Sequence, residues 1–269
     1  MTDWKVAIQE DMLPGPKLED RFLQAADLGL QGIEFWSEHL PGQAAEIERL
    51  SGRGAVAASS INNGRRSRFL DPDPEERARA MAELVEAVEL AGRIGADGVV
   101  YVPHFFDPLL PDLSPYKTAI QLERALLRAQ LERLAEAADR AQVQLWVEPV
   151  NREETHLLNR LGQAIAVIDP PAHKRLGIVA DLFHMAQEEP DIPAAILDNR
   201  AHIGHVHLAD SNRKLPGQGS TAFGPVLEAL IEIDYGGWLA LECGEPGQNQ
   251  PRAGQYSADL PDCLSSTFG

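Results

Sequence analysis

The chain has 269 residues, 44% of them hydrophobic, and a formal net charge of −17. This length fits one large domain or two small ones, and barrels of alternating strands and helices often reach it as one domain. The acidity argues against a nucleic-acid partner, because phosphates require a basic surface. We expect most acidic side chains to solubilise the surface, and an acidic cleft that binds a divalent cation is compatible with the same charge.

Targeting and redox signals are weak in this chain. The first residues, Met1 to Lys5, lack the basic and apolar segments of a signal peptide, and no apolar run reaches the length of a membrane span. Only two cysteines occur, Cys243 and Cys263, so no disulfide framework is implied. We therefore expect a soluble, cytoplasmic protein with no membrane partner.

Short apolar runs alternate with helical patterns along the chain. The expected strands are 4–8, 32–36, 55–61, 98–102, 143–147, 176–180, 203–208 and 238–241. The expected helices are 18–26, 43–50, one opened by Asp73-Pro74, 118–140, 160–168, 192–197 and 222–233. Alternation of this kind predicts a parallel sheet. Eight such units predict an α/β fold with a single closed (β/α)8 TIM barrel over residues 1–269, in which 248–269 form a tail or a short final helix.

Four of the late strands end in a group that can bind a metal. Glu148, Asp181, His207 and Glu242 stand at the ends of strands five to eight, with spacings of 181−148=33, 207−181=26 and 242−207=35 residues. Each spacing is close to one strand–helix unit, so the four side chains should converge at the same barrel mouth. Three carboxylates and one imidazole suit one divalent ion, with Mn²⁺, Mg²⁺ or Co²⁺ favoured and Zn²⁺ also compatible.

Other polar residues near these strand ends are candidates for binding a substrate. Glu154 can accept from a hydroxyl, His184 follows Asp181 by three residues, and Arg213 offers a planar cationic donor. Trp36 can stack on a sugar, and His104 can form a substrate wall or, as a minor alternative, an extra metal ligand. For each, an ordinary loop, packing or surface role is the competing interpretation.

Four further features have weaker assignments. His205 points to the same side of its strand as His207 but lies deeper, which indicates a core position. Asp210 either orients neighbouring side chains or shapes its loop, and Glu34 receives no role. Arginines 65, 66 and 68 could bind a phosphate, although surface charges are the favoured interpretation.

Five segments together resemble a known family. They are Glu148-Pro-Val-Asn-Arg-Glu-Glu154-Thr, Asp181-Leu-Phe-His184-Met, His205-Val-His207-Leu-Ala-Asp-Ser-Asn-Arg213, Pro216-Gly-Gln-Gly219 and Leu241-Glu242. The chain resembles the xylose-isomerase-like barrel superfamily, and within it the sugar isomerase and epimerase group. That group includes ketose 3-epimerases, hydroxypyruvate isomerase and inosose-processing enzymes. The resemblance covers nearly the whole chain, is specific in the second half and only architectural in the first.

The resemblance implies roles for individual residues. Glu148, Asp181, His207 and Glu242 would bind one divalent metal, with Glu148 and Glu242 as the acid/base pair. Glu154, His184 and Arg213 would contact the substrate. The chain departs from the family pattern at Ala186, where a polar residue is expected, and at residues 220–222, where many relatives carry a His and an acid. These departures leave the ligand set intact but leave the substrate open.

The expected reaction is proton transfer next to a carbonyl. A bound divalent ion would polarise the carbonyl of a ketose or hydroxyketone, and a glutamate would remove the neighbouring proton to give an enediolate. Returning the proton gives an epimerase or an isomerase, and loss of hydroxide would instead give a dehydratase or lyase. An abasic-site endonuclease and a non-catalytic sugar-binding barrel are weaker alternatives. The expected partner is a small sugar or sugar phosphate, and assembly into a homo-oligomer stays open.

Overall fold

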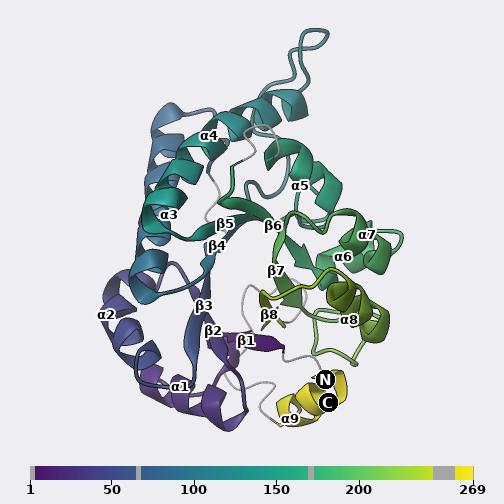
Figure 1. The fold of residues 1–269 in the computed structure, drawn as a ribbon. Coiled ribbons are helices and arrows are strands. Elements are labelled where there is room, and N and C mark those ends of the chain that lie inside the picture. The colour runs from purple at the N-terminus through teal and green to yellow at the C-terminus, as the bar shows by residue number, and fades with distance from the viewer. Residues whose placement is uncertain (1–3, 65–67, 169–172, 245–257, 269) are drawn as a thin grey trace.

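Eight parallel strands close into a barrel in the computed structural model, which describes residues 4–64, 68–168, 173–244 and 258–268 (Figure 1). The strands are β1 (Lys5–Gln9), β2 (Gly32–Trp36), β3 (Ala57–Asn62), β4 (Gly98–Tyr101), β5 (Gln144–Val147), β6 (Leu176–Asp181), β7 (Ile203–Leu208) and β8 (Trp238–Leu241). Each strand pairs in parallel with the next, and β8 pairs with β1, so no sheet edge remains. The predicted (β/α)8 barrel is confirmed.

Helices surround the barrel (Figure 1). They are α1 (Leu18–Asp27), α2 (Leu40–Ser51), α3 (Pro74–Ile94), α4 (Ala119–Ala141), α5 (Leu161–Ile168), α6 (Leu182–Glu188), α7 (Ile192–Asp198), α8 (Phe223–Glu232) and α9 (Leu260–Phe268), with a short 3-10 helix, η1 (Glu10–Met12), after β1. The patterns predict only α7 of the two helices between β6 and β7. Helix α6 follows β6 directly and its first four residues are all buried, so it shows no alternation of apolar and polar faces. Helix α9 is the short helix expected near the end, whereas 248–257 lie outside the described residues.

The third strand begins later than predicted. The apolar run suggested a start at Ala55, but the paired residues begin at Ala57, which lies beside Gly32 at the start of β2. Val56 is buried without belonging to the strand. The predicted boundary is therefore wrong by two residues, since an apolar run records burial whereas a strand requires a neighbour to pair with.

Helix α3 illustrates how local sequence sets the element ends. Asp73 caps its N-terminus by accepting a hydrogen bond from the backbone of Glu75, and Pro74 occupies the first turn. Gly95 ends the helix with a φ of 76°, in the left-handed region that glycine adopts without strain. The helix predicted from Asp73-Pro74 is confirmed.

Two tryptophans fill the barrel interior toward the end where the strands begin. Trp146 packs with Val100 and Val179, and Trp238 packs with Ala7 and Ala240. Three strands leave room for the Trp146 indole by carrying glycine, at Gly98, Gly177 and Gly204; a Cβ at Gly98 would lie 2.7 Å from the ring and one at Gly177 2.9 Å. We call Trp146 and Trp238 the indole floor. The polar residues of the barrel lie on the same inward faces, toward the strand ends.

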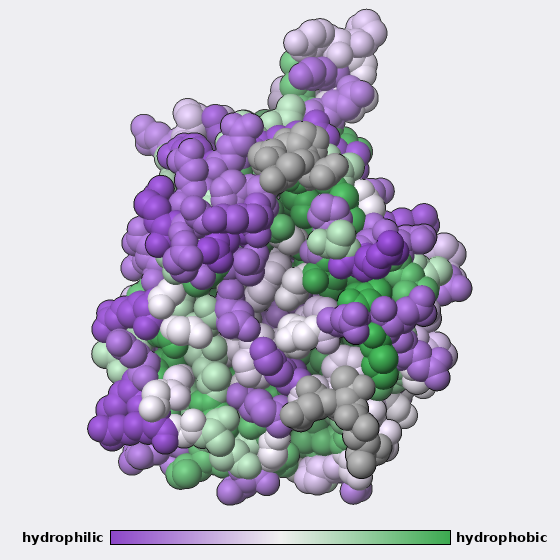
Figure 2. Space-filling model, viewed as in Figure 1, coloured by the Kyte–Doolittle hydropathy of each residue, from purple (hydrophilic) through white to green (hydrophobic). Residues whose placement is uncertain are grey.

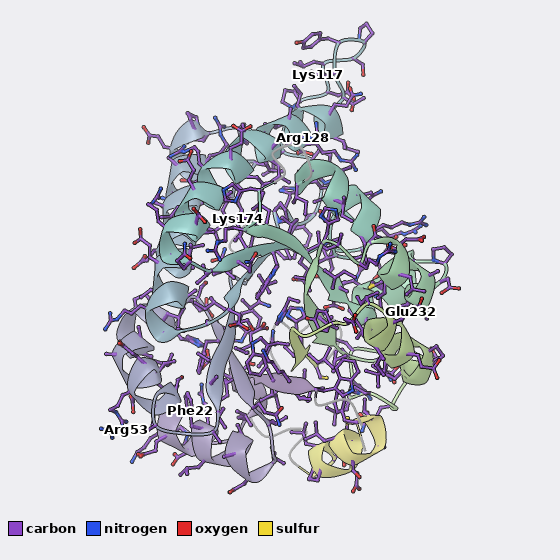
Figure 3. The ribbon with its side chains drawn as sticks, in the orientation of Figure 1. Phe22, Arg53, Lys117, Arg128, Lys174 and Glu232 are labelled. Carbon is purple, nitrogen blue, oxygen red and sulfur yellow. The ribbon has the colours of Figure 1, made fainter. Side chains whose placement is uncertain are left out.

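The segment 107–117, which joins β4 to α4, projects away from the barrel beyond α4, as Figure 1 and the position of Lys117 in Figure 3 show. Tyr116 in this segment is 75% exposed. Hydrophilic side chains cover the outer faces of α3 and α4 (Figure 2). None of the helices in the described ranges combines the length and apolarity needed to cross a membrane.

Candidate active site

The four predicted metal ligands converge inside the barrel. One oxygen or nitrogen atom from each of Glu148, Asp181, His207 and Glu242 lies within 4.8 Å of the others, and all four residues are buried. Glu148 and Glu242 directly follow β5 and β8, whereas Asp181 and His207 belong to β6 and β7. The strand-end spacing therefore led to a real cluster.

The imidazole of His207 lies at the centre of this cluster. Its Nδ1 is 3.0 Å from Oε1 of Glu148, 2.9 Å from Oε2 of Glu242 and 3.6 Å from Oδ2 of Asp181. A single N–H cannot donate to three carboxylates, and Oε2 of Glu242 has no hydrogen-bond partner despite its closeness to Nδ1. Three carboxylates crowd one nitrogen atom here.

Glu34 holds the other side of the same imidazole. Its Oε1 and Oε2 lie 3.2 Å and 3.4 Å from Nε2 of His207, and Oε2 also accepts from Nε2 of His205 at 3.0 Å and from the hydroxyl of Ser60 at 2.7 Å. The Glu34 side chain is fully buried. With a cation bound among the three carboxylates, Glu34 would keep the proton of His207 on Nε2 and leave the Nδ1 lone pair free to bind that cation.

This arrangement fits a divalent cation. A cation between the groups would replace the crowding at Nδ1 with coordination, and it would give the unpartnered oxygen of Glu242 a ligand role. Carboxylate oxygens dominate the donor set, as hard divalent ions prefer. The described residues thus form a group that can hold a metal ion.

The titration behaviour follows from burial and charge. Burial raises the pKa of Glu148, and the neighbouring carboxylates of Glu242 and Asp181 act in the same direction against the opposing effect of His207. Burial also works to raise the pKa of Asp181, but His184 and His207 outweigh it and lower that pKa. Within one cluster, Glu148 therefore holds a proton more readily than Asp181 does.

Two polar side chains that the sequence did not single out support the cluster. Gln9, the last residue of β1, donates its Nε2 to Oε1 of Glu34 at 3.0 Å and to Oε1 of Glu242 at 2.9 Å. Asn62, the last residue of β3, lies 3.4 Å from the same Glu242 oxygen. The signal that could have found Gln9 and Glu34 is a polar side chain at an inward position of an otherwise apolar strand.

His184 faces the cluster as a neutral donor. Its Nδ1 accepts hydrogen bonds from the backbone and the side chain of Asn151, at 3.1 Å and 2.9 Å, which places the proton on Nε2. Asp181 caps α6 by accepting from the backbone of His184 at 3.0 Å. Burial lowers the pKa of His184, so the imidazole presents a neutral Nε2–H group.

Arg213 lies at the edge of the same group. Its guanidinium stacks on the ring of Phe183, 4.7 Å from the ring centroid, and comes within 3.6 Å of Oε1 of Glu242 and 3.4 Å of Nε2 of His184. Stacking fixes the plane of the guanidinium. The structure brings Arg213 and His184 together with the four predicted ligands.

Asp210 shapes the loop after β7. Its fully buried carboxylate accepts hydrogen bonds from the backbone of Ser211, Gly217, Gly219 and Thr221, at 2.7 to 2.9 Å. Of the two roles left open by the sequence, the hydrogen bonds support the loop-shaping one. The loop positions Arg213 indirectly, because Arg213 lies within it.

Replacing this anchor should destabilise the protein. In Asp210→Ala the four backbone N–H groups lose a charged acceptor, and we expect the free energy of unfolding to fall by about 2–3 kcal/mol. Urea denaturation followed by circular dichroism measures this. The exposed Asp27→Ala is the control and should change the stability by less than about 0.5 kcal/mol. Equal stabilities of the two variants would contradict the anchoring role.

The remaining sequence candidates lie in different surroundings. Trp36 ends β2, is partly buried, and donates its backbone N–H to Glu10 at 3.0 Å. Glu154 lies in the loop after β5, where its backbone bonds to Asn151 at 3.0 Å. His104 is buried against His156 and bonds to the carbonyl of Asp107.

Of the three arginines after β3, only Arg68 is described. It is exposed and pairs with Asp71 at 3.2 Å and Glu76 at 3.7 Å. Residues 65 and 66 lie outside the described residues. The favoured surface interpretation holds for Arg68, whose charge is engaged by two acids.

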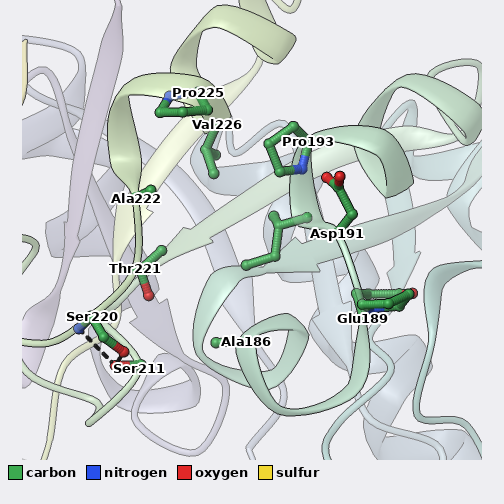
Figure 4. Close-up of a pocket in the computed structure, with 12 residues that line it drawn as sticks. Ala186, Glu189, Asp191, Pro193, Ser211, Ser220, Thr221, Ala222, Pro225 and Val226 are labelled. Carbon is green, nitrogen blue, oxygen red and sulfur yellow. Dashed lines mark hydrogen bonds between the residues drawn. The ribbon is translucent and has the colours of Figure 1, made fainter.

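A hollow of about 310 Å³ separates α6 and α7 from the start of α8 (Figure 4). Both departures from the family pattern line it, namely Ala186 on α6 and the run Ser220, Thr221 and Ala222 before α8. The departures thus face one shared space. The acidic residues Glu189 and Asp191 also line this hollow and disfavour an anionic occupant.

The comparisons with known proteins agree with the fold. The family model described as xylose isomerase-like TIM barrel matches residues 22–263. The chain therefore belongs to the xylose isomerase-like TIM barrel family. It is 26% identical to the 3-dehydro-D-guloside 4-epimerase of Escherichia coli over 88% of this chain and 91% of that protein. It is 30% identical to the L-ribulose 3-epimerase of Mesorhizobium japonicum over 84% of this chain and 75% of that protein.

A solved structure repeats the architecture over nearly the full length. The 3-keto-D-glucoside 4-epimerase from Escherichia coli superposes with a TM-score of 0.86 and 24% identity, covering 98% of this chain and 99% of that chain. The predicted resemblance to the sugar isomerase and epimerase group is confirmed, because these named relatives are sugar epimerases.

Proposed function

We propose that this protein is a divalent-metal-dependent epimerase of a ketose or keto sugar, inverting the carbon next to the carbonyl. The convergence of Glu148 and Glu242 on one nitrogen of His207, from strands on different sides of the site, carries the proposal. The names of the relatives support it. The name 3-dehydro-D-guloside 4-epimerase describes a substrate with a ketone at C3 and inversion at the neighbouring carbon, C4.

Glu148, Asp181, His207 and Glu242 would hold one divalent ion, with Mn²⁺, Mg²⁺ or Co²⁺ favoured by the carboxylate-rich set and Zn²⁺ compatible with it. When bound, the ion supplies Lewis-acid polarisation of the substrate carbonyl and its α-hydroxyl. Glu34 keeps the proton of His207 on Nε2, and thereby keeps Nδ1 available as a ligand.

The two glutamates would move the proton. One carboxylate removes the hydrogen from the carbon α to the carbonyl, which converts the substrate to an enediolate. The other returns a proton to the opposite face of the same carbon, which gives the epimer. Return to the neighbouring carbon would give aldose–ketose isomerisation, and the epimerase names of the relatives favour the first outcome.

The surrounding groups would orient the sugar. The Nε2–H of His184 can donate to a substrate oxygen because Asn151 occupies its Nδ1. The guanidinium of Arg213, held by its stacking on Phe183, can donate to a second oxygen. Glu154 would accept from a hydroxyl, and Trp36 would pack on an apolar sugar face. Holding the reacting atoms in this way supplies much of the rate enhancement expected of such a site.

The comparisons give the dehydratase alternative no support, since the named relatives are epimerases. An endonuclease of the same barrel type would need a surface that attracts DNA, and the net charge of −17 opposes this. A barrel that binds sugar without catalysis is separated from an epimerase only by experiment.

The test is solvent exchange. Free and phosphorylated ketoses and 3-keto glycosides are incubated with the protein and Mn²⁺ in D₂O, and deuterium at the carbon next to the carbonyl is followed by NMR. We expect exchange together with formation of the epimer for at least one unphosphorylated substrate. Loss of water, detected by mass, would indicate a dehydratase. Binding of a sugar with no exchange at any carbon would leave only the non-catalytic alternative.

A further inference from the structure

A second cluster of metal-binding side chains lies outside the four-residue site. His104 follows β4, Glu123 is in the first turns of α4, and His156 lies in the loop after β5. One ligand atom from each lies within 4.8 Å of the others. None of the three takes part in the proton transfer proposed above.

Backbone carbonyls set the protonation of both imidazoles. Nε2 of His104 is 2.8 Å from the carbonyl oxygen of Asp107, which can only accept, so Nε2 carries the proton. Nδ1 of His104 then presents a lone pair, and it has no hydrogen-bond partner although the residue is only 2% exposed. In the same way Nδ1 of His156 donates to the carbonyl of Phe106 at 2.7 Å, which leaves Nε2 to face Glu123.

The carboxylate of Glu123 is fixed in a matching orientation. Its Oε1 accepts hydrogen bonds from the backbone of Leu109 at 3.0 Å and of Leu110 at 3.5 Å. Its Oε2 lies 2.5 Å from Nε2 of His156. One oxygen therefore anchors the loop, and the other is directed at Nε2 of His156.

We propose that His104, Glu123 and His156 bind a Zn²⁺ ion, through Nδ1 of His104, Oε2 of Glu123 and Nε2 of His156. Two imidazoles and one carboxylate with an open fourth position form a ligand set that zinc accepts. Carbonyl groups that hold the second nitrogen of each histidine are the usual companions of such ligands. The set is richer in imidazole than the barrel cluster, so the two sites should differ in their preference for zinc.

The competing arrangement is a plain ion pair. Although burial lowers the pKa of His156, its hydrogen bond to Glu123 outweighs this and raises it, so a protonated His156 can pair with Glu123 without any metal. That pair makes no use of the buried, unpartnered nitrogen of His104, which a metal ion would engage. Zinc binding would displace the proton of His156.

A zinc ion here would join three segments at the base of the projecting segment 107–117. The loops after β4 and β5 already meet there, where Phe106 donates its backbone N–H to the carbonyl of Glu154 at 2.6 Å. Bound zinc would therefore cross-link these loops, with a water molecule in its fourth position. It would hold the projecting segment against the body of the barrel.

The test counts zinc in the full chain. Protein stripped with a chelator is dialysed against buffered Zn²⁺, and bound metal is measured by mass spectrometry. We expect two ions per chain in the wild type, one in His156→Gln, one in His207→Gln, and two in the control His202→Gln, which lies outside both clusters. No loss of bound zinc in His156→Gln relative to the wild type would overturn the proposal, whatever the barrel site binds.

Cobalt gives a second readout that does not depend on catalysis. Co²⁺ in a four-coordinate imidazole-rich site absorbs visible light far more strongly than Co²⁺ in a carboxylate-rich site of higher coordination. The strong band should persist in His207→Gln and disappear in His156→Gln, with circular dichroism confirming that both variants are folded. A band that is lost only in His207→Gln would contradict the assignment. Neither measurement requires the epimerase proposal to hold.

Discussion

The variant Glu242→Gln should lose epimerisation, with kcat lowered by about 10²- to 10⁴-fold, while still exchanging the α-hydrogen of one of the two epimers. If Glu148 and Glu242 serve opposite faces of the substrate, removing one base leaves the other able to remove a proton from the epimer that presents its hydrogen to it. Glu148→Gln should show the mirror image, with exchange restricted to the other epimer. Deuterium incorporation from D₂O, measured separately for each epimer, checks this.

Metal content must be measured alongside, because both glutamates are proposed ligands. A glutamine can still coordinate through its amide oxygen, so a loss of turnover with metal retained reports on proton transfer. Full activity of Glu242→Gln would remove this residue from the chemistry. Loss of exchange from both epimers, in a variant that retains its metal, would contradict the two-base arrangement.

The variant Glu34→Gln should lower the affinity for the barrel-site metal by about 10- to 100-fold. The neutral amide can donate to Nε2 of His207, which would move the imidazole proton to Nδ1 and remove the lone pair from the site. Calorimetric titration of the stripped protein with Mn²⁺ gives the affinity.

Ser60→Ala is the matched control, because it removes a different partner of the same carboxylate and leaves its charge unchanged. We expect a smaller loss of affinity in that variant. An unchanged Mn²⁺ affinity in a folded Glu34→Gln would show that this carboxylate does not orient His207. The unfolding temperatures of both variants separate a local effect from a general loss of stability.

The late half of the barrel was predictable because its functional residues stand where strands end. In a parallel barrel those ends meet at one mouth, so spacing alone brought Asp181 and His207 to the same site. His205 was correctly placed in the interior, since it stacks on Trp146 and is fully buried.

The position of Glu34 was detectable from the sequence, but its role was not, for a physical reason. It lies in mid-strand among apolar residues, and its role arises only when β2 and β7 face each other across the barrel, 173 residues apart in the chain. Asn151 was missed for a similar reason, because its value lies in fixing the tautomer of His184. Helix α6 was not predicted because it continues directly from β6 and its first four residues are all buried, so the sequence shows no amphipathic pattern there.

The indole floor has a consequence for how such a protein can change. Trp146 takes the space that side chains from three neighbouring strands would otherwise occupy, so enlarging Gly98, Gly177 or Gly204 would require a smaller residue at 146. The Trp146 ring also stacks on His205, which is hydrogen-bonded to Glu34. A substitution of Trp146 would therefore shift Glu34 and, through it, the metal-binding cluster. Substitutions in the loops at the strand ends would leave this packing unchanged, whereas a substitution at Trp146 would disturb the three glycines, His205 and Glu34 together.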